Sequence, residues 1–591
     1  MAQDLYIFVK FQCSFLGRAA MLACDAIVIG GGAAGIGAAQ ELRKAGLQDV
    51  VILEARQRLG GRVHSSDELG CGVPLDKGAQ WIHGYSPTHP MVKLADELDK
   101  AHSPMAGGLS TTVLSDGRTV SRPLEFKAGK KFSDLRKRVA TGKEGLQPSE
   151  DCSWIESAKR IGDVEALTPE EQAVLNLRIY NSCENYEGAR LDHWSARNWN
   201  KATCLPGGNG DVAEGFGDLI VESARDLRVQ FNRRVESIAY MTQADLCQDI
   251  PHVVVRCKNT GIEGNVEEIY CAPCCLVTLP LGILRAGHVK FEPELPSCKR
   301  RAISTLGISV MNKIELLWHR RWWPNGVDSF QVASLESTPT YHPWPWFYEP
   351  AAMRRHPLGW AGLVCYATGQ FAEYVESLSE DEAARQCLAA LRSAFPAEDV
   401  PEPAEVHVTR WASDDCAHGS WTYFAVGSGP DDVRALREPI GLNGCVAFAG
   451  EHTCDGSVPG LDIGTVHGAW CSGELAAKGL VKRLGRGLGE LSLENLGMQR
   501  CAHRHCTDSV IPEMEGYRPG VMVQVTNTPS DIAEEFCVDP DEAPSIPRAQ
   551  LYCGKRGTIT HRSCWGWLRV EFHDGSPSRW WTPYCLWILH C

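Results

Sequence analysis

The chain of 591 residues is long enough for two or three domains, and its 44% hydrophobic and 22% charged residues are typical of a folded globular protein. Its formal net charge of −14 argues against a nucleic-acid-binding surface, which has to be basic, and suits a cationic substrate. No apolar run reaches the roughly 18 residues that span a bilayer. We therefore expect neither nucleic acid nor a membrane as a partner.

The cysteines and the first residues bear on the cellular compartment. The 25 cysteines are scattered without the spacing of a disulfide framework, which is typical of reduced thiols inside a cell. The apolar stretch from Leu5 to Val9 lacks the charged start and the unbroken core of a secretory signal. We expect a dispensable leader, with Met21 as an alternative start, and a cytoplasmic location. An organelle transit peptide is the alternative.

The first predicted strand, residues 26–29, leads into a turn with three glycines: Gly30, Gly32 and Gly35. An alanine-rich helix follows, and then a second apolar strand, residues 50–53, that ends at Glu54. This order is the fingerprint of a Rossmann-type dinucleotide-binding fold. The glycines allow a tight turn, a close approach of the pyrophosphate and close packing of the helix, and Glu54 accepts hydrogen bonds from the ribose.

The residues after Glu54 indicate FAD rather than a nicotinamide cofactor. Three arginines and two glycines follow the acid directly: Arg56, Arg58, Gly60, Gly61 and Arg62. Guanidinium groups and bare backbone suit the diphosphate of a flavin that is held permanently in an extended pose. The segment resembles the FAD-binding segment of the flavin-containing amine oxidase family.

A second run, from Gly78 through Trp81 and His83 to Gly84, narrows this resemblance. It is similar to the segment that lies beside the flavin ring in polyamine and spermine oxidases. The resemblance implies that Gly78 and Trp81 contact the cofactor and that His83 orients the substrate nitrogen. A structural histidine is the alternative.

Residues 91–204 alternate helix-like segments with polar loops and belong to the predicted substrate domain. The resemblance implies that Glu184 lies on the wall of a substrate tunnel, where carboxylates bind the distal ammonium groups of a polyamine. A surface acid is the alternative. Asn200 stands where the related lysine-specific histone demethylases have an aspartate, which weakens a histone-tail interpretation.

The chain then returns to alternating helices and strands. We expect a helix at 216–227, strands at 229–231, 235–240, 253–257, 275–279, 313–318 and 363–368, and a capped helix after Ser379. Lys313 in an apolar strand is costly to bury without a role. The resemblance implies that it holds a water against flavin N5 and assists the reaction with dioxygen. A lysine at the strand edge that reaches solvent is the alternative.

An aromatic cage is implied by the resemblance around Ser420 and Trp421. Monoamine oxidases have a flavin-linked cysteine at the position of Ser420, so serine implies non-covalent FAD. Trp421 forms one wall, and Thr465 stands where those enzymes have a second tyrosine. A half-open cage favours a long, flexible polyamine over a flat aromatic amine.

A predicted strand from residue 446 ends near Glu451, and a helix begins after Thr465 and Val466. The resemblance implies that Glu451 contacts the ribityl or phosphate part of FAD. It also implies that the helix N-terminus lies near the isoalloxazine ring, where the helix dipole favours charge on the reduced ring.

The last hundred residues differ in composition. Residues 486–514 are interpreted as a linker, and the cluster from Cys501 to Cys506 as polar linker rather than a zinc site, because its four ligands leave little chain to wrap a tetrahedral ion. Short β-rich runs at 515–591 predict a small all-β, SH3-like module that could bind a protein partner.

The expected architecture is α/β. A Rossmann-type FAD-binding domain (24–90, 205–300 and 441–485) is interleaved with an α+β substrate domain (91–204 and 301–440) and is followed by the linker and the β module. The expected activity is FAD-dependent oxidation of a polyamine to an aldehyde and an amine, with dioxygen reduced to hydrogen peroxide. The alternatives are a lysine demethylase-like oxidase and a flavin-bearing scaffold that acts through its C-terminal module.

Overall fold

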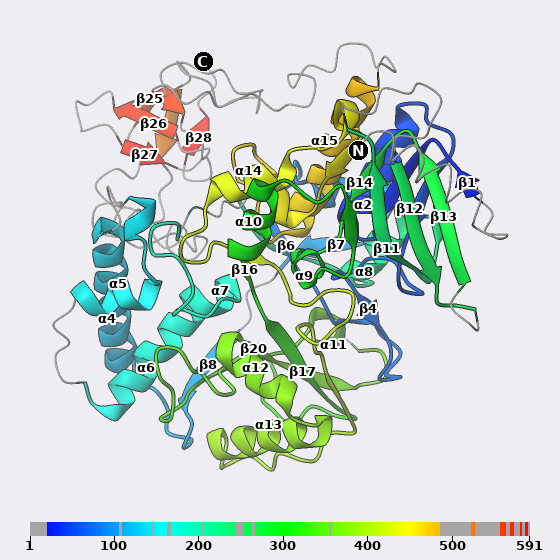
Figure 1. Cartoon of the computed structure of the whole chain (residues 1–591). Coiled ribbons are helices and arrows are strands. Elements are labelled where there is room, and N and C mark those ends of the chain that lie inside the picture. The colour runs from blue at the N-terminus through cyan, green and yellow to red at the C-terminus, as the bar shows by residue number, and fades with distance from the viewer. Residues whose placement is uncertain are drawn as a thin grey trace. The chain divides into compact units, whose positions relative to one another are not determined.

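The structure is a computed structural model. It describes residues 21–105, 109–142, 147–161, 167–199, 201, 205–242, 253–262, 266–354 and 356–484, and the backbone of five C-terminal strands. The chain divides into two compact units: a large one of residues 1–83, 87–205 and 209–490, and a second one of residues 84–86, 206–208 and 491–591. Figure 1 shows the elements. Among the described residues, no helix combines the length and the hydropathy needed to cross a membrane.

A parallel five-stranded sheet forms the centre of the predicted dinucleotide-binding fold. Its order is β10 (Arg228–Gln230), β3 (Val50–Leu53), β2 (Ala26–Ile29), β14 (Cys275–Val277) and β23 (Val446–Phe448). The predicted strands at 26–29 and 50–53 are confirmed residue for residue. Their side chains are buried throughout, as expected for a parallel sheet with both faces covered.

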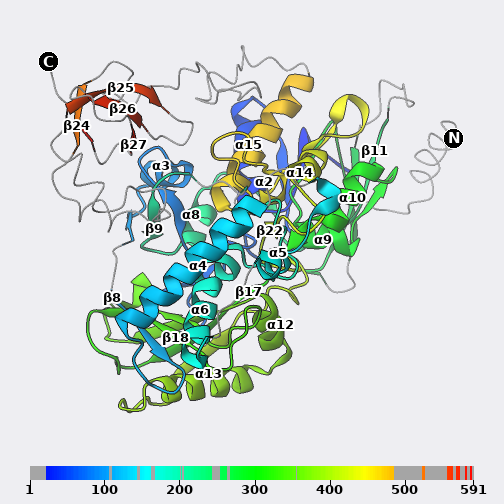
Figure 2. The same ribbon diagram turned by 90° about the vertical axis from the view of Figure 1, so that its left-hand side faces the viewer.

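Two helices from opposite ends of the large unit cover this sheet together. They are α2 (Ala33–Lys44) and α15 (Val466–Arg483), which lie side by side in Figures 1 and 2. The contact is close because Gly473 has no side chain: a Cβ there would lie 2.0 Å from the carbonyl oxygen of Ala34. The packing therefore brings the first and last motifs of the catalytic region together.

A second five-stranded sheet has the order β1 (Met21–Ala23), β13 (Val266–Ala272), β12 (Val253–Asn259), β11 (Arg233–Tyr240) and β15 (Lys290–Glu292). It shares one hydrophobic core with the parallel sheet. Residues of α9 (Leu281–Ala286), α10 (Ser297–Thr305) and α14 (Pro430–Arg437) belong to this core. The helix α8 (Phe216–Glu222) precedes β10 in the chain.

A six-stranded mixed sheet forms a separate layer of the large unit. Its order is β21 (Glu405–Val408), β17 (Met311–Trp318), β20 (Ala361–Thr368), β19 (Trp346–Tyr348), β18 (Val327–Ala333) and β8 (Leu109–Leu114). One face packs against α12 (Gly369–Ser377) and α13 (Glu380–Ala394), as Figure 1 shows. The helices α4 (Arg122–Gly142), α5 (Trp154–Ile161) and α6 (Pro169–Ile179) form a further aromatic-rich core.

Short elements connect these layers. The short strands are β4 (Ser65–Ser66), β5 (Leu75–Asp76), β6 (Ile82–Tyr85), β7 (His102–Pro104), β9 (Gly208–Val212), β16 (Gly307–Ile308) and β22 (Thr422–Tyr423). The short helices are α3 (Pro90–Glu97), α7 (Asn185–Glu187), α11 (Ala351–Arg354), the 3₁₀ turns η1 (Pro148–Glu150), η3 (Leu442–Gly444) and η4 (Glu451–Thr453), and the π-helical turn η2 (Tyr180–Glu184).

Several predicted boundaries are wrong. The helix expected to reach residue 227 ends at Glu222, because the chain has to turn before Arg228 pairs with Val51 in the parallel sheet. The strands expected from residues 313 and 363 begin two residues earlier, where Met311 pairs with Thr368 and Trp318 with Ala361. The expected capping box at α13 is half formed, with the Ser379 side chain accepting from the Glu382 N–H.

The described C-terminal strands form an antiparallel sheet. The order is β27 (Arg579–Trp581), β26 (Leu568–Phe572), β25 (Arg556–Arg562), β24 (Met522–Val525) and β28 (Leu586–Ile588). The prediction that this region contains β-strands is confirmed, and its assignment to the SH3-like class stays a prediction. Asn200, the linker at 486–514 and the cluster from Cys501 to Cys506 lie outside the described residues.

Candidate active site

The glycine turn between β2 and α2 has the shape that a dinucleotide requires. Gly30 has a φ of +103°, a conformation that side chains disfavour. A Cβ on Gly35 would lie 1.9 Å from the carbonyl oxygen of Gly30, whereas one on Gly32 would find its nearest neighbour 3.8 Å away, at the Gly60 oxygen. Gly32 is the N-cap of α2 and supplies no side-chain cap, so the helix N-terminus offers backbone N–H groups to an anion.

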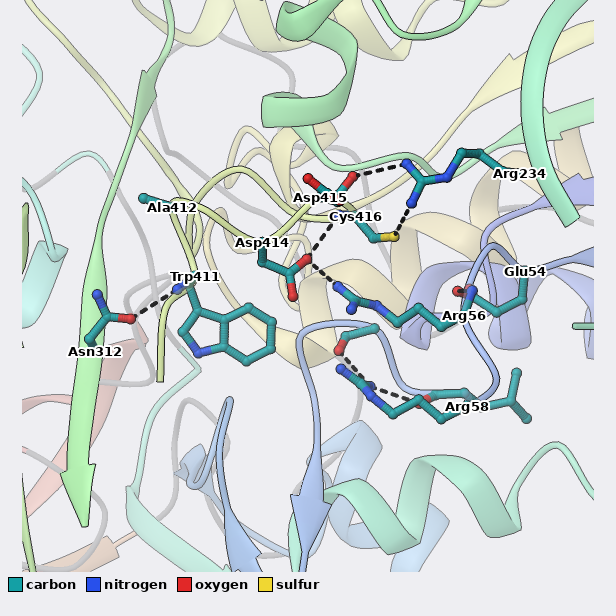
Figure 3. A network of polar contacts seen from close by, with 12 residues as sticks. Glu54, Arg56, Arg58, Arg234, Asn312, Trp411, Ala412, Asp414, Asp415 and Cys416 are labelled. Carbon is teal, nitrogen blue, oxygen red and sulfur yellow. Dashed lines mark hydrogen bonds and ion pairs between the residues drawn. The ribbon is translucent and has the colours of Figure 1, made fainter. Parts of the chain in front are cut away.

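Glu54 is buried beside this turn, and Figure 3 shows it next to Arg56. Its Oε2 accepts from the Gly31 N–H at 2.7 Å and its Oε1 from the Arg56 N–H at 2.8 Å. The Arg56 guanidinium is ion-paired with Asp414, and Arg58 donates to the carbonyl oxygens of Leu59 and Gly61. The arginines therefore hold the loop at residues 54–62, which we call the cofactor loop, in one conformation. The Arg56 guanidinium binds Asp414 and so is not free to bind a phosphate.

Arg62 and Glu451 join the two halves of the cofactor motif. Arg62 Nη1 lies 3.0 Å from Glu451 Oε1 and donates to the Ser420 carbonyl at 2.8 Å. Glu451 also accepts from the Thr422 N–H, the Thr422 hydroxyl and the Gly464 N–H, at 3.0–3.2 Å. A Cβ on Gly61, which has a φ of +59°, would lie 3.6 Å from the Gly32 Cα, so the two glycines lie close together. Segments almost 400 residues apart in sequence thus meet at one site.

Lys313 is buried on β17, with 4% of its surface exposed, so the alternative of a solvent-reaching lysine is wrong. Its Nζ donates to the carbonyl oxygens of Asp76 and Gly78 and to Gln80 Oε1, the last two at 2.9 and 3.0 Å. Burial lowers its pKa to about 8. A Cβ on Gly78 would lie 1.9 Å from the Arg62 carbonyl oxygen, so the absence of a side chain there keeps this segment against the cofactor loop.

An aromatic wall stands next to Lys313. The Trp81 ring lies 5.8 Å from the Tyr366 ring, 5.6 Å from Tyr348 and 6.0 Å from Trp346. The Tyr366 hydroxyl donates to Gln80 Oε1 at 2.7 Å, the same oxygen that accepts from Lys313. No sequence motif points to these tyrosines and Trp346, because only the pairing of β17, β19 and β20 brings them to Lys313.

His83 is exposed, with its Nδ1 2.8 Å from Asn209 Oδ1 and its ring 6.2 Å from that of Trp81. Desolvation by the surrounding protein lowers the pKa of His83. A neutral imidazole whose Nδ1 is engaged can present Nε2 to a ligand. His83 thus lies next to Trp81, and its role toward the substrate nitrogen stays a prediction.

Ser420, Trp421 and Thr465 lie together near the start of α15. The Ser420 hydroxyl accepts from the Met311 N–H and donates to the Met311 carbonyl, so it is held by backbone. Trp421 packs on Gly464, where a Cβ would meet its ring at 2.8 Å. The Thr465 hydroxyl caps α15 by accepting from the Gly468 N–H at 3.0 Å, which leaves Val466 as the first helical residue.

Glu184 is fully buried at the end of the π-helical turn η2, so the surface alternative is wrong. Its carboxylate lies against Gly369, and His342 Nε2 is 3.9 Å from its Oε2. Burial raises its pKa well above the usual range. π-Helical turns are frequent at functional sites, although this carboxylate has no access to solvent in the structure.

The comparisons with known proteins agree with this geometry. The family model for flavin containing amine oxidoreductases matches residues 33–481. Polyamine oxidase 5 from Oryza sativa subsp. japonica is 32% identical over 80% of this chain and 90% of its own length. The Lysine-specific histone demethylase 1 homolog 3 of Arabidopsis thaliana is more distant, with 27% identity over 72% of this chain and 28% of that protein.

The fold has a counterpart among solved structures. An engineered double mutant of putrescine oxidase superposes with a TM-score of 0.60, at 18% identity, over 78% of this chain and 100% of the other. The open N-terminus of α2, the glycine cradle and the buried acid Glu54 fit a flavin dinucleotide. Ser420 supplies no sulfur for a flavin bond, which fits non-covalent FAD. The chain belongs to the flavin-containing amine oxidase family and is an FAD-dependent amine oxidase.

Proposed function

We propose that the protein oxidises polyamines, namely spermine, spermidine or their acetylated forms, to an aldehyde and a shorter amine, with reduction of dioxygen to hydrogen peroxide. The similarity to polyamine oxidases supports this substrate class: Polyamine oxidase 5 of Oryza sativa subsp. japonica is 32% identical over 80% of this chain. The net charge of −14 also favours a polycation over a neutral amine.

The observation that carries the proposal is the buried Lys313 beside the Trp81–Tyr366 wall. Amine oxidation by a flavin needs a dry, aromatic surface that orients the amine and a polar group for the oxygen reaction. FAD, when bound, supplies the acceptor for two electrons and a proton from the amine. The protein supplies orientation, desolvation and the Lys313 cation.

The residues divide this work between cofactor and substrate. The turn at Gly30, Gly32 and Gly35 would hold the diphosphate, and Glu54 would accept from the ribose. Arg62 and Glu451, with Gly61 and Gly78, would shape the middle of the cofactor site, while Arg56 braces it through Asp414. The start of α15 at Thr465 and Val466 would face the isoalloxazine ring beside Trp81.

On the substrate side, His83 would orient the reacting nitrogen, and Trp421 with Thr465 would form the half-open cage. Glu184 would bind a distal ammonium group, which requires its carboxylate to become accessible when the substrate enters. Because burial raises the pKa of Glu184, an ammonium partner would return that carboxyl group to its ionised form. Lys313 would act in the reaction with dioxygen.

The test is a product analysis with purified, FAD-loaded protein. We expect spermine or a related polyamine to bleach the flavin without air and to yield hydrogen peroxide, an aldehyde and a shorter amine with air. Butylamine, which lacks the distal ammonium groups, should react much more slowly. A methylated lysine peptide that is oxidised faster than any polyamine would favour the demethylase-like alternative.

We further propose that the C-terminal strands form an SH3-like module with a protein partner, joined through the linker at 486–514. The five antiparallel strands support a small β module. The interleaved FAD-binding and substrate domains and the cytoplasmic location remain predictions from sequence. A protein that binds FAD without oxidising any amine would favour the scaffold alternative.

A further inference from the structure

A small polar pocket lies next to Lys313, and its lining includes none of the residues assigned above to the amine. Its cavity measures about 30 Å³ and lies between the end of β5, β9, β17 and α11. Its lining combines polar side chains with small apolar residues. The lining includes Asp76, Gln80, Asp211 and Glu315, together with Ala213 and Ala352.

Two lining residues bind Lys313 directly. The side-chain oxygen of Gln80 accepts from Lys313 Nζ at 3.0 Å, and the carbonyl oxygen of Asp76 accepts from the same nitrogen. The pocket is therefore separated from the ammonium group by a single layer of hydrogen-bond acceptors. Either oxygen can accept a hydrogen bond from a water molecule in place of the bond from Lys313 Nζ.

The lining contains a buried acceptor that has no hydrogen-bond donor among the described residues. Glu315 is fully buried and stands two residues after Lys313 on β17, so both side chains lie on the same face of the strand. Its Oε2 pairs with Lys77, whereas its Oε1 has no hydrogen-bond partner within the part of the chain that the structure describes. A buried acceptor of this kind requires a donor, and a cavity of 30 Å³ holds on the order of two waters.

The proposed reaction with dioxygen needs a proton at this place. Conversion of dioxygen to hydrogen peroxide takes up two electrons and two protons. FAD, when bound, would supply both electrons and one of these protons, so the other proton would have to come from solvent. Lys313 can give up that proton only if a second route restores it.

We propose that this pocket is a water-filled passage through which solvent protons reach Lys313. The proposal rests on the proposed function, because it assigns the oxygen reaction to Lys313. One proton leaves the Lys313 ammonium for the oxygen site, and a pocket water bonded to Glu315 returns one from solvent. Asp76, whose pKa is raised to about 6 mainly by burial, is a further proton-carrying group on the same wall.

The passage can be filled without touching Lys313, Glu315 or Gln80. Ala352→Phe on α11 and Ala213→Leu after β9 add bulk to the pocket from different elements, so the result does not depend on the folding of one variant. Leu358→Phe is the matched control, since Leu358 is 74% exposed and lies outside the lining. The flavin is reduced by light, so that no amine substrate is needed.

Two measurements decide the proposal. A crystal structure of the FAD-loaded wild type should show water within hydrogen-bond distance of Glu315 Oε1, and the filled variants should lack it. Photoreduced filled variants should be reoxidised by oxygenated buffer at least fivefold more slowly, with a larger solvent isotope effect, while Leu358→Phe matches wild type. A dry pocket in the wild type, or filled variants with unchanged reoxidation, would overturn the passage. Failure of polyamines to reduce the flavin would instead contradict the proposed function alone.

Discussion

At the scale of single residues, Gln80 explains why an aromatic wall and a buried cation occur together. Its Oε1 accepts from both Lys313 Nζ and the Tyr366 hydroxyl, so the lysine and the ring are held in one arrangement. The Lys313 ammonium lies 5.6 Å from the centre of the Tyr366 ring, where the ring face stabilises the cation. These contacts offset part of the cost of burying the charge.

Replacement of Lys313 by methionine should separate the two halves of the reaction. We expect Lys313→Met to bind FAD and to be reduced by polyamine at close to the wild-type rate. Reoxidation by dioxygen should be slower by about 100-fold, because a fixed positive charge matters most when negative charge develops on oxygen. Stopped-flow absorbance measures both steps, and Lys93→Met on the exposed face of α3 is the control. Equal reoxidation in both variants would remove Lys313 from this role.

The same residue predicts a pH dependence. The pKa of Lys313 is lowered to about 8 by burial, so the ammonium form prevails below pH 8 and the neutral amine above it. If the cation assists the oxygen reaction, the reoxidation rate of wild type should fall as the pH rises through about 8. Lys313→Met should show a flat profile across pH 7–9.5. A wild-type profile without a transition in this range would contradict the assignment.

At the scale of elements, sequence patterns predicted the parts that local chemistry determines. The strands at 26–29 and 50–53 and the turn at Gly30 follow from apolar runs bounded by glycine and acid. The wall of Trp346, Tyr348 and Tyr366 could not be predicted, because it depends on the register of three strands. The pairing of Arg56 with Asp414 likewise joins residues 358 positions apart, which no spacing rule links.

The close contact of α2 with β2 gives a test of the glycine turn. We expect Gly35→Ala to lose FAD and to unfold at a lower temperature, because its Cβ would lie 1.9 Å from the Gly30 carbonyl oxygen. Gly129→Ala is the matched control: no atom lies within 4 Å of its Cβ position, and it sits within α4, where alanine favours the helix. FAD content after gel filtration and thermal unfolding are the measurements. A Gly35→Ala protein with full FAD content would contradict the close-packing argument.

The C-terminus of α14 gives a second test at this scale. Lys299 on α10 is buried and donates to the carbonyl oxygens of Ala435, Leu436 and Glu438, which end α14. Lys299→Met would remove three hydrogen bonds to the last carbonyl groups of α14, of which the one to Leu436 is buried, so the free energy of unfolding should fall by about 2–4 kcal/mol. Arg300→Met, at an exposed site on the same helix, should change it by less than about 0.5 kcal/mol. Chemical denaturation measures both variants.

At the scale of the whole molecule, every residue assigned to cofactor or substrate belongs to the large unit. The family match ends at residue 481, close to the last residue of α15. The change in composition after Val481 predicts this division. The strand order of the six-stranded sheet could not be predicted from the sequence, because the sheet pairs β8 with strands from residue 311 onward. Interleaved chain segments can be recognised only when the long-range pairs are known.

The C-terminal module should therefore be dispensable for chemistry. A chain that ends at Leu488 keeps α15 and both halves of the cofactor motif, so we expect it to fold, bind FAD and oxidise spermine at close to the full-length rate. The measurements are FAD content, thermal unfolding and peroxide formation, with the full-length protein prepared in parallel. A shortened protein that is soluble but has lost FAD or turnover would show that the C-terminal residues belong to the catalytic unit. Such a result would remove the basis for a separate binding module, because a module joined by a linker leaves the chemistry of its neighbour unchanged.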